Sequence, residues 1–317
     1  MMEALLIVLG LVGLVFASDV AVNGAKGIAA KLGISPLMVG LTITSIGTSL
    51  PEIATNISVA LNSAGGHDAS AIAVGNVIGS NLSQITLLLG ITALVAPLAV
   101  RRKIIIRDGL AMFVAMGAMF LTCVDGVTTR GEAITLMAIY AGYLTVIWRT
   151  ERAPAGTPRP EPVEGERSVW IDVAATLAGL AVVVFAADLV IDNSVVIARA
   201  AGVSETVIGL FVGIATGLPE LSVGVRSVRA GAPELALGNL IGSNVTDPLL
   251  SYGAGAAVHD VVIPNGVIDF DFPFWGAATA LALIFMASRG VLGRREGAAL
   301  ILVFAGYMTS RALVVGI

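Results

Sequence analysis

Long apolar stretches follow one another along the whole chain, each about as long as a helix that crosses a bilayer. About 20 predominantly apolar residues are enough for such a helix, and a helix satisfies its own backbone hydrogen bonds in lipid. We predict ten spans, near residues 4–30, 36–62, 69–97, 108–124, 131–149, 169–199, 205–228, 233–258, 270–288 and 296–314. The pattern therefore predicts an all-α polytopic membrane protein.

One stretch that is rich in Pro and Glu interrupts this pattern near the middle of the chain. It covers residues 150–168, and such a composition is typical of a loop. We therefore divide the chain into a first group of five spans over 1–149, a connecting loop over 150–168 and a second group of five spans over 169–317.

The composition supports a membrane protein and indicates few partners. Of 317 residues, 56% are hydrophobic and 13% are charged, against about 25% charged in soluble domains. The net charge of −4 and the lack of a basic run give no sign of nucleic-acid binding. No nucleotide-binding motif, cofactor site or obligate protein partner is indicated. The apolar stretch over 1–22 lacks a basic start, so we interpret it as a helix of the mature protein.

The two halves of the chain repeat each other. FASD at 16–19 returns as FAAD at 185–188, TSLPE at 48–52 as TGLPE at 216–220, GNVIGSN at 75–81 as GNLIGSN at 238–244, and AGYLT at 141–145 as AGYMT at 305–309. Each copy holds five predicted spans, an odd number, so the second copy would be inverted in the membrane. Two inverted five-helix repeats are typical of alternating-access transporters, whose binding site lies between the repeats near the midplane.

The basic residues predict an orientation. With the N-terminus outside the cell, 15 of the 18 Lys and Arg residues fall in loops on the inner side. Lys and Arg concentrate in cytoplasmic loops of membrane proteins. We therefore expect an integral protein of the plasma (cell inner) membrane with both termini outside and the 150–168 loop in the cytoplasm.

Two glutamates lie deep inside predicted spans. Glu52 falls in the second span and Glu220 in the seventh, where a charge costs about 2.5 kcal/mol or more. Each directly follows a proline, Pro51 or Pro219, which interrupts a helix and frees backbone carbonyls. Hard cations bind carboxylates and carbonyl oxygens together, so both positions are candidate cation ligands.

Polar residues at helical spacing surround the two glutamates. In the second and seventh spans they are Ser45, Thr48, Ser49 and Glu52, and Gly213, Thr216, Gly217 and Glu220. In the third and eighth spans they are Asn76, Ser80, Ser83 and Gln84, and Asn239, Ser243, Thr246 and Asp247. Two glutamates balance one Ca²⁺, and a third carboxylate at Asp247 would suit several Na⁺ instead.

These motifs resemble the two α-repeats of the cation/Ca²⁺ exchanger superfamily, the sodium/calcium exchanger branch above all. That family's pattern, Gly-Thr-Ser-x-Pro-Glu followed by Gly-Asn-x-x-Gly-Ser-Asn, has a counterpart in both halves, and the resemblance covers essentially all ten spans. It implies a secondary antiporter, with no cofactor, that exchanges Ca²⁺ for Na⁺. It also implies the ligands Glu52, Glu220, Thr48, Thr216, Ser49, Gly217, Ser45, Gly213, Ser80, Gln84, Ser243 and Asp247.

The chain departs from the family pattern at three positions. Gly217 stands where the second repeat is expected to carry a serine, and Ala215 replaces the glycine before Thr216. Gln84 stands where the family usually has asparagine. These departures affect the expected Na⁺ stoichiometry and the identity of the coupling ion. They leave the expected role of the two glutamates unchanged.

Other polar and small residues are interpreted as structural. Gly75, Gly79, Gly238 and Gly242 form small-xxx-small pairs that let helices approach closely. Asn81, Asn244, Asp19 and Asp188 are expected to hold helices together. Asp108, Asp125, Asp269, Asp271 and Glu132 lie near the ends of spans, where we expect solvated side chains.

Three functions besides exchange of Ca²⁺ for Na⁺ are weighed on the residues alone. Exchange of Ca²⁺, or of another divalent cation, for H⁺ would use the same scaffold, although similar proton-coupled proteins tend to carry an amide where this chain has Asp247. An intramembrane hydrolase with paired carboxylates lacks its Gly-x-Gly-Asp motif here, so we do not expect an enzyme. A channel fits charged midplane ligands less well than stepwise exchange.

Overall fold

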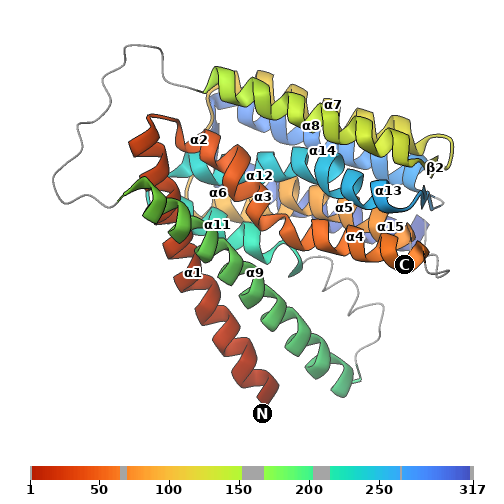
Figure 1. Cartoon of the computed structure of the whole chain (residues 1–317), viewed down its shortest axis with the longest axis horizontal. Coiled ribbons are helices and arrows are strands. Elements are labelled where there is room, and N and C mark those ends of the chain that lie inside the picture. Colours follow the sequence, from red (N-terminus) through yellow and green to blue (C-terminus); the bar gives the residue numbers. More distant parts are fainter. Residues whose placement is uncertain (1, 65–69, 152–167, 203–214, 265, 315–317) are drawn as a thin grey trace. The chain divides into compact units, whose positions relative to one another are not determined.

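The computed structural model describes residues 2–64, 70–151, 168–202, 215–264 and 266–314 (Figure 1). The described chain forms two compact units, and each unit combines two separate segments. Unit 1 comprises Met1–Thr48 and Thr145–Gly242, and unit 2 comprises Ser49–Leu144 and Ser243–Ile317. The predicted 150–168 loop and the start of the seventh span fall mostly outside the described residues.

The predicted helical membrane protein is confirmed. Six described helices are long and apolar enough to cross a membrane, or seven if Pro36–Thr48 and Leu50–Ala64 form one broken span. The described helix ends lie close to the predicted ends of the spans. The exception is the fourth predicted span, whose helix starts at Arg102, six residues before the expected 108. The number of ten spans and their inverted arrangement stay predictions.

Unit 1 is built around two long helices. Its elements are α1 (Met2–Leu32), α2 (Pro36–Val39), the π-helical turn η1 (Gly40–Thr44), α3 (Ser45–Thr48), α9 (Val169–Ala200), α11 (Leu218–Arg229) and most of α12 (Pro233–Thr246). Helices α1 and α9 run side by side (Figure 1). A side chain at Gly179 of α9 would place its Cβ 2.6 Å from the backbone nitrogen of Ala21, and one at Gly24 of α1 would place its Cβ 2.7 Å from the carbonyl oxygen of Asp172. Glycine is therefore required for the close contact of these two helices.

The predicted close packing of small residues is confirmed in the second repeat. A Cβ at Gly238 would lie 2.5 Å from the carbonyl oxygen of Leu37, and a Cβ at Gly242 would lie 2.7 Å from Cβ of Ser45. These glycines let α12 contact the segment formed by α2, η1 and α3. At Gly75 and Gly79, by contrast, a Cβ would meet no atom of the described residues within 4 Å.

Unit 2 contains the remaining elements. They are α4 (Leu50–Ala64), α5 (Ser70–Ser83), the π-helical turn η2 (Gln84–Leu88), α6 (Leu89–Val95), β1 (Leu98–Ala99), α7 (Arg102–Cys123), β2 (Val127–Thr128), α8 (Arg130–Thr150, its last turns in unit 1), the π-helical turn η3 (Asp247–Ser251), α13 (Tyr252–Val258), β3 (Val261–Val262), the π-helical turn η4 (Val267–Asp271), α14 (Phe272–Arg289), β4 (Val291–Leu292) and α15 (Arg294–Val314).

Two short antiparallel strand pairs join the two halves of the sequence inside unit 2. Strand β1 pairs with β4, with Leu98 opposite Leu292, and β2 pairs with β3, with Val127 opposite Val262. In the repeats, β1 corresponds to β3 and β2 corresponds to β4. Exchanging the two halves therefore converts one pair into the other.

The expectation that Asp108 and Asp271 are solvated is wrong. Asp108 is fully buried and receives two hydrogen bonds from Arg107, at 2.9 Å and 2.8 Å. Asp271 is 3% exposed; it accepts a hydrogen bond from the Tyr307 hydroxyl at 3.0 Å and forms an ion pair with Arg311 at 2.8 Å. A charge-assisted partner is what makes a buried carboxylate tolerable.

The other structural interpretations have mixed outcomes. Asp19 forms an ion pair with Arg226, which links α1 to α11 as expected. Asn244 donates to the side-chain oxygen of Gln84 at 3.0 Å and links α12 to η2. Asn81 instead donates to the carbonyl oxygen of Val77 in its own helix, at 2.8 Å.

The contact between α1 and α9 yields a stability prediction. Gly179→Leu should lower the free energy of unfolding by roughly 1–3 kcal/mol, because the new side chain overlaps the backbone of α1. Thermal unfolding of the purified protein measures this change. The matched control is Gly142→Leu on an exposed face of α8, where a Cβ meets no described atom within 4 Å. Equal melting temperatures for the two variants would contradict the role of Gly179.

Candidate functional site

The second span is broken where the sequence predicts it. Ser49 forms a turn between α3 and α4, and Pro51 lies in the first turn of α4. A missing N–H costs no helical bond at that position. The backbone nitrogen of Ile53 donates to the carbonyl oxygen of Ser49 at 3.0 Å, which starts the new helix. Glu52 therefore lies in a first helical turn, where the helix dipole stabilises an anion.

A half-buried asparagine fixes the backbone at Glu52, whose side chain is 1% exposed. Asn76 of α5 donates to the carbonyl oxygen of Glu52 and to Oδ1 of Asn56, both at 3.4 Å. Asn56 in turn donates to the hydroxyl of Ser251 at 2.8 Å. The sequence analysis missed Asn56, although its place one turn after Glu52 puts it on the same face of the helix. These bonds hold α4 against α5 and η3.

Gln84 and Asp247 form the polar centre of unit 2. The side-chain amide of Gln84 donates to Oδ2 of Asp247 at 2.9 Å, and the hydroxyl of Ser80 donates to the same oxygen at 3.3 Å. All three side chains are buried. The family resemblance placed an amide and an acid at these two positions, and the structure brings them into contact.

Both residues of this pair begin a π-helical turn, Gln84 in η2 and Asp247 in η3. Such turns occur frequently at functional sites because they change the direction of side chains within a helix. Pro248 lies inside η3 and lacks a backbone N–H, which suits an altered hydrogen-bond pattern. The sequence analysis did not predict either turn.

Two predicted serine ligands complete the site residues of unit 2. Ser49 lies next to the Asp247 carboxylate, and Ser49 is fully buried. Ser243 is also fully buried, and among the described residues its hydroxyl has no hydrogen-bond partner. A buried hydroxyl without a partner is costly unless something else contacts it.

Unit 1 repeats the arrangement around Glu220, which is fully buried. The seventh span is broken at 216–217, and Glu220 lies in the first turn of α11 after Pro219. Asn239 of α12 donates to the carbonyl oxygen of Glu220 at 3.5 Å, as Asn76 does to Glu52. The hydroxyl of Thr48 donates to Oδ1 of Asn239 at 3.2 Å.

The remaining predicted ligands of unit 1 have different environments. Ser45 is buried and donates to the carbonyl oxygen of Thr42 at 3.2 Å, and Thr216 is half-buried. Gly217 is the N-cap of α11 with φ −79°, a conformation open to any residue, so its backbone does not require glycine. Gly213 lies outside the described residues.

The chemistry of both sets of residues suits hard cations. Carboxylate, hydroxyl, amide and carbonyl oxygens are the groups that bind Ca²⁺. In the described part of the chain, no three His, Cys, Asp or Glu side chains cluster closely enough to hold a metal ion. A cation bound by these residues would therefore use hydroxyl, amide or carbonyl oxygens in addition to carboxylates.

Comparison with known proteins gives a consistent result. The family model described as "Sodium/calcium exchanger protein" matches residues 2–149 and 171–312. CaxA of Alkalimonas amylolytica is 35% identical over 97% of this chain and 98% of its own length. The sodium/calcium exchanger MaX1 of Methanosarcina acetivorans is 28% identical over 96% and 97%. The structure of the sodium-calcium exchanger NCX_Mj soaked with 2.5 mM Na⁺ and 0.1 mM Ca²⁺ superimposes with a TM-score of 0.83, at 26% identity and with 98% of each chain covered.

The family match and the fold define a membrane transporter for cations, not an enzyme. The chain belongs to the sodium/calcium exchanger family, since the family model matches both halves of the sequence. Its fold is that of the exchanger NCX_Mj.

The contact between Gln84 and Asp247 predicts a cost for removing the amide. Gln84→Leu should lower the free energy of unfolding by roughly 1–3 kcal/mol, because the buried Asp247 carboxylate loses a donor. Chemical denaturation of the purified protein measures it. Thr86→Val is the matched control, since Thr86 is buried nearby but donates only to a carbonyl of its own helix. A smaller loss for Gln84→Leu than for Thr86→Val would refute the assignment.

Proposed function

We propose that this chain is a secondary antiporter that exchanges Ca²⁺ for Na⁺ by alternating access, with Glu52 and Glu220 as the carboxylates that bind the transported ions. One observation carries the proposal. In each unit, a fully or almost fully buried glutamate follows a proline at a helix break, and an asparagine of the next helix donates to its carbonyl oxygen. Two copies of one arrangement are difficult to explain by packing alone.

The other predicted ligands would supply further oxygens within the same unit as each glutamate. In unit 2 these are Ser49, Ser80, Ser243, Gln84 and Asp247, and in unit 1 they are Ser45, Thr48, Thr216 and Gly217, with Gly213 outside the described residues. Gly217 can contribute only a carbonyl oxygen where its counterpart Ser49 also offers a hydroxyl. The second copy therefore provides fewer side-chain oxygens for Na⁺.

We also propose that ten spans form two inverted five-helix repeats over 1–149 and 169–317, joined by a cytoplasmic loop over 150–168. The strand pairs support this arrangement, because exchanging β1 with β3 and β2 with β4 leaves the pairing unchanged. Such an exchange is what a two-fold axis between the halves would produce. The distribution of Lys and Arg supports external termini and a place in the plasma (cell inner) membrane.

The motif glutamates yield the central test. In vesicles loaded with Na⁺, Ca²⁺ uptake should fall by at least about a hundredfold in Glu52→Gln and in Glu220→Gln, because loss of a buried charge partner costs roughly 3 kcal/mol or more. Uptake of radiolabelled Ca²⁺ into reconstituted vesicles measures it. Glu132→Gln provides the same substitution at a half-buried glutamate that caps the start of α8, away from the two motifs.

Three outcomes would reject the proposal, two in this assay and one in an electrical recording. Full Na⁺-driven uptake in both glutamate variants would remove their role. Uptake driven by a pH gradient without Na⁺ would favour exchange with H⁺. Large single-channel currents in a bilayer recording would favour a channel.

Asp247 provides a separate test of Na⁺ coupling. Asp247→Asn leaves two motif glutamates to balance Ca²⁺ but removes a charge that could balance an additional Na⁺. We expect the Na⁺ concentration for half-maximal Ca²⁺ flux to rise at least about tenfold, the equivalent of 1.4 kcal/mol. Exchange of Ca²⁺ for Ca²⁺ without Na⁺ serves as the internal control and should persist. An unchanged Na⁺ dependence would show that Asp247 does not bind Na⁺.

A further inference from the structure

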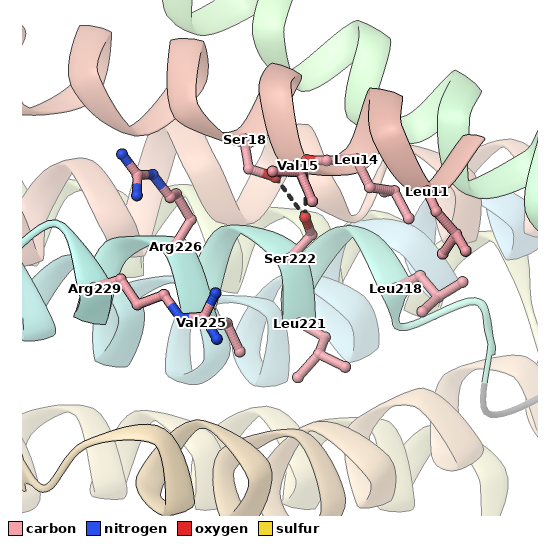
Figure 2. A pocket seen from close by; sticks show the side chains of 10 residues that line it. All are labelled: Leu11, Leu14, Val15, Ser18, Leu218, Leu221, Ser222, Val225, Arg226 and Arg229. Carbon is pink, nitrogen blue, oxygen red and sulfur yellow. Dashed lines mark hydrogen bonds between the residues drawn. The ribbon is translucent and has the colours of Figure 1, made fainter. Parts of the chain in front are cut away.

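A groove of about 300 Å³ lies between α1 and α11 within unit 1 (Figure 2). This volume is at the lower end of ordinary ligand pockets. Aliphatic side chains form most of its lining, namely Leu11, Leu14, Val15, Leu218, Leu221 and Val225. Leu11 is 49% exposed and Val15 is 59% exposed, so the groove is open along the side of α1.

The hydroxyl groups in the groove bond to the protein itself. The hydroxyls of Ser18 and Ser222 form a hydrogen bond with each other (Figure 2), and each also reaches the carbonyl oxygen of Leu14. Hydroxyls that already have partners offer little to a polar ligand. The long middle part of the groove therefore suits an apolar occupant.

The two arginines of the groove lie at the C-terminal end of α11 and differ in their environment. Arg226 forms an ion pair with Asp19 of α1. Arg229 is exposed, and no acidic partner is found for it among the described residues. An exposed guanidinium beside an apolar groove can bind a phosphate group through two parallel hydrogen bonds.

The length of the groove matches one leaflet of a bilayer. Eleven residue steps separate Leu218 from Arg229, which corresponds to about 16 Å of helix. This is about half of the roughly 30 Å hydrocarbon core. With Leu218 near the midplane, Arg229 would lie at the level of the lipid headgroups.

We propose that this groove binds an anionic glycerophospholipid, with one acyl chain along the aliphatic lining and the phosphate on Arg229. The groove carries a positive charge at one end, and its apolar lining is about as long as one leaflet is thick. Both features fit this single class of ligand. A bound chain would contact both α1 and α11 and would oppose their separation. Ligands that bind only the folded state raise the temperature of unfolding.

Native mass spectrometry of the full chain in detergent tests the proposal. The probes are phosphatidylglycerol and phosphatidylcholine with identical acyl chains, and glycerophosphoglycerol as the headgroup without chains. We expect the first phosphatidylglycerol to bind about fivefold more tightly than phosphatidylcholine. Arg229→Gln should remove this preference, whereas Arg295→Gln, at an exposed arginine of α15, should keep it. Val15→Trp should fill the groove and weaken the binding of both lipids.

Each other outcome overturns the proposal. Equal binding of the two lipids, or a preference that survives Arg229→Gln, would remove the role of the charge. Undiminished binding in Val15→Trp would place the lipid elsewhere. Binding of glycerophosphoglycerol as tight as that of the lipid would identify a site for free anions. Thermal unfolding with and without phosphatidylglycerol confirms that each variant is folded and should show a lipid-dependent rise only where the lipid binds.

Discussion

In each half of the chain a carboxylate is buried at a helix break, and the geometry that the two halves share depends on this burial. A charge removed from water is stable only with compensating dipoles or ions around it. The break places Glu52 and Glu220 in the first turn of a helix, where the dipole favours an anion. Proline fits that turn without loss of a hydrogen bond. The proline before each glutamate is therefore part of the electrostatic solution as well as the cause of the break.

The second motif follows from the same constraint. A break interrupts the ladder of backbone hydrogen bonds, so contacts with a neighbouring helix are needed to fix the backbone there. The asparagine of each Gly-Asn motif donates to the carbonyl of the glutamate itself, at 3.4 Å for Asn76 and 3.5 Å for Asn239. The glycine before Asn239 brings α12 into backbone contact with α2, since no side chain fits at Gly238. In each half, the two motifs are therefore hydrogen-bonded to each other, although about 20 residues separate them in the sequence.

The features predicted from the sequence are those with a local cause. Hydropathy located the helices because lipid selects for apolar length, and Pro51 and Pro219 located the breaks because a proline acts on its own helix. Burial of Asp271 escaped prediction, because its partners Tyr307 and Arg311 lie on another helix. The π-helical turns at Gln84 and Asp247 escaped for a different reason. They are changes in backbone hydrogen bonding, for which helical periodicity contains no signal.

The two halves use the shared geometry with different chemistry. Asn56, which accepts from Asn76 and donates to Ser251, corresponds to Gly224 in the second repeat, so α11 lacks this buried amide. The acid of the central pair comes from the second repeat at Asp247, and the amide comes from the first at Gln84. Ser49 of the first repeat has its counterpart in Gly217, whose backbone would accept a serine. A repeated backbone with unequal side chains makes the two halves electrostatically distinct. In a transporter built on inverted repeats, ligands that differ in this way can give each ion its own position without any change in the symmetry of the fold.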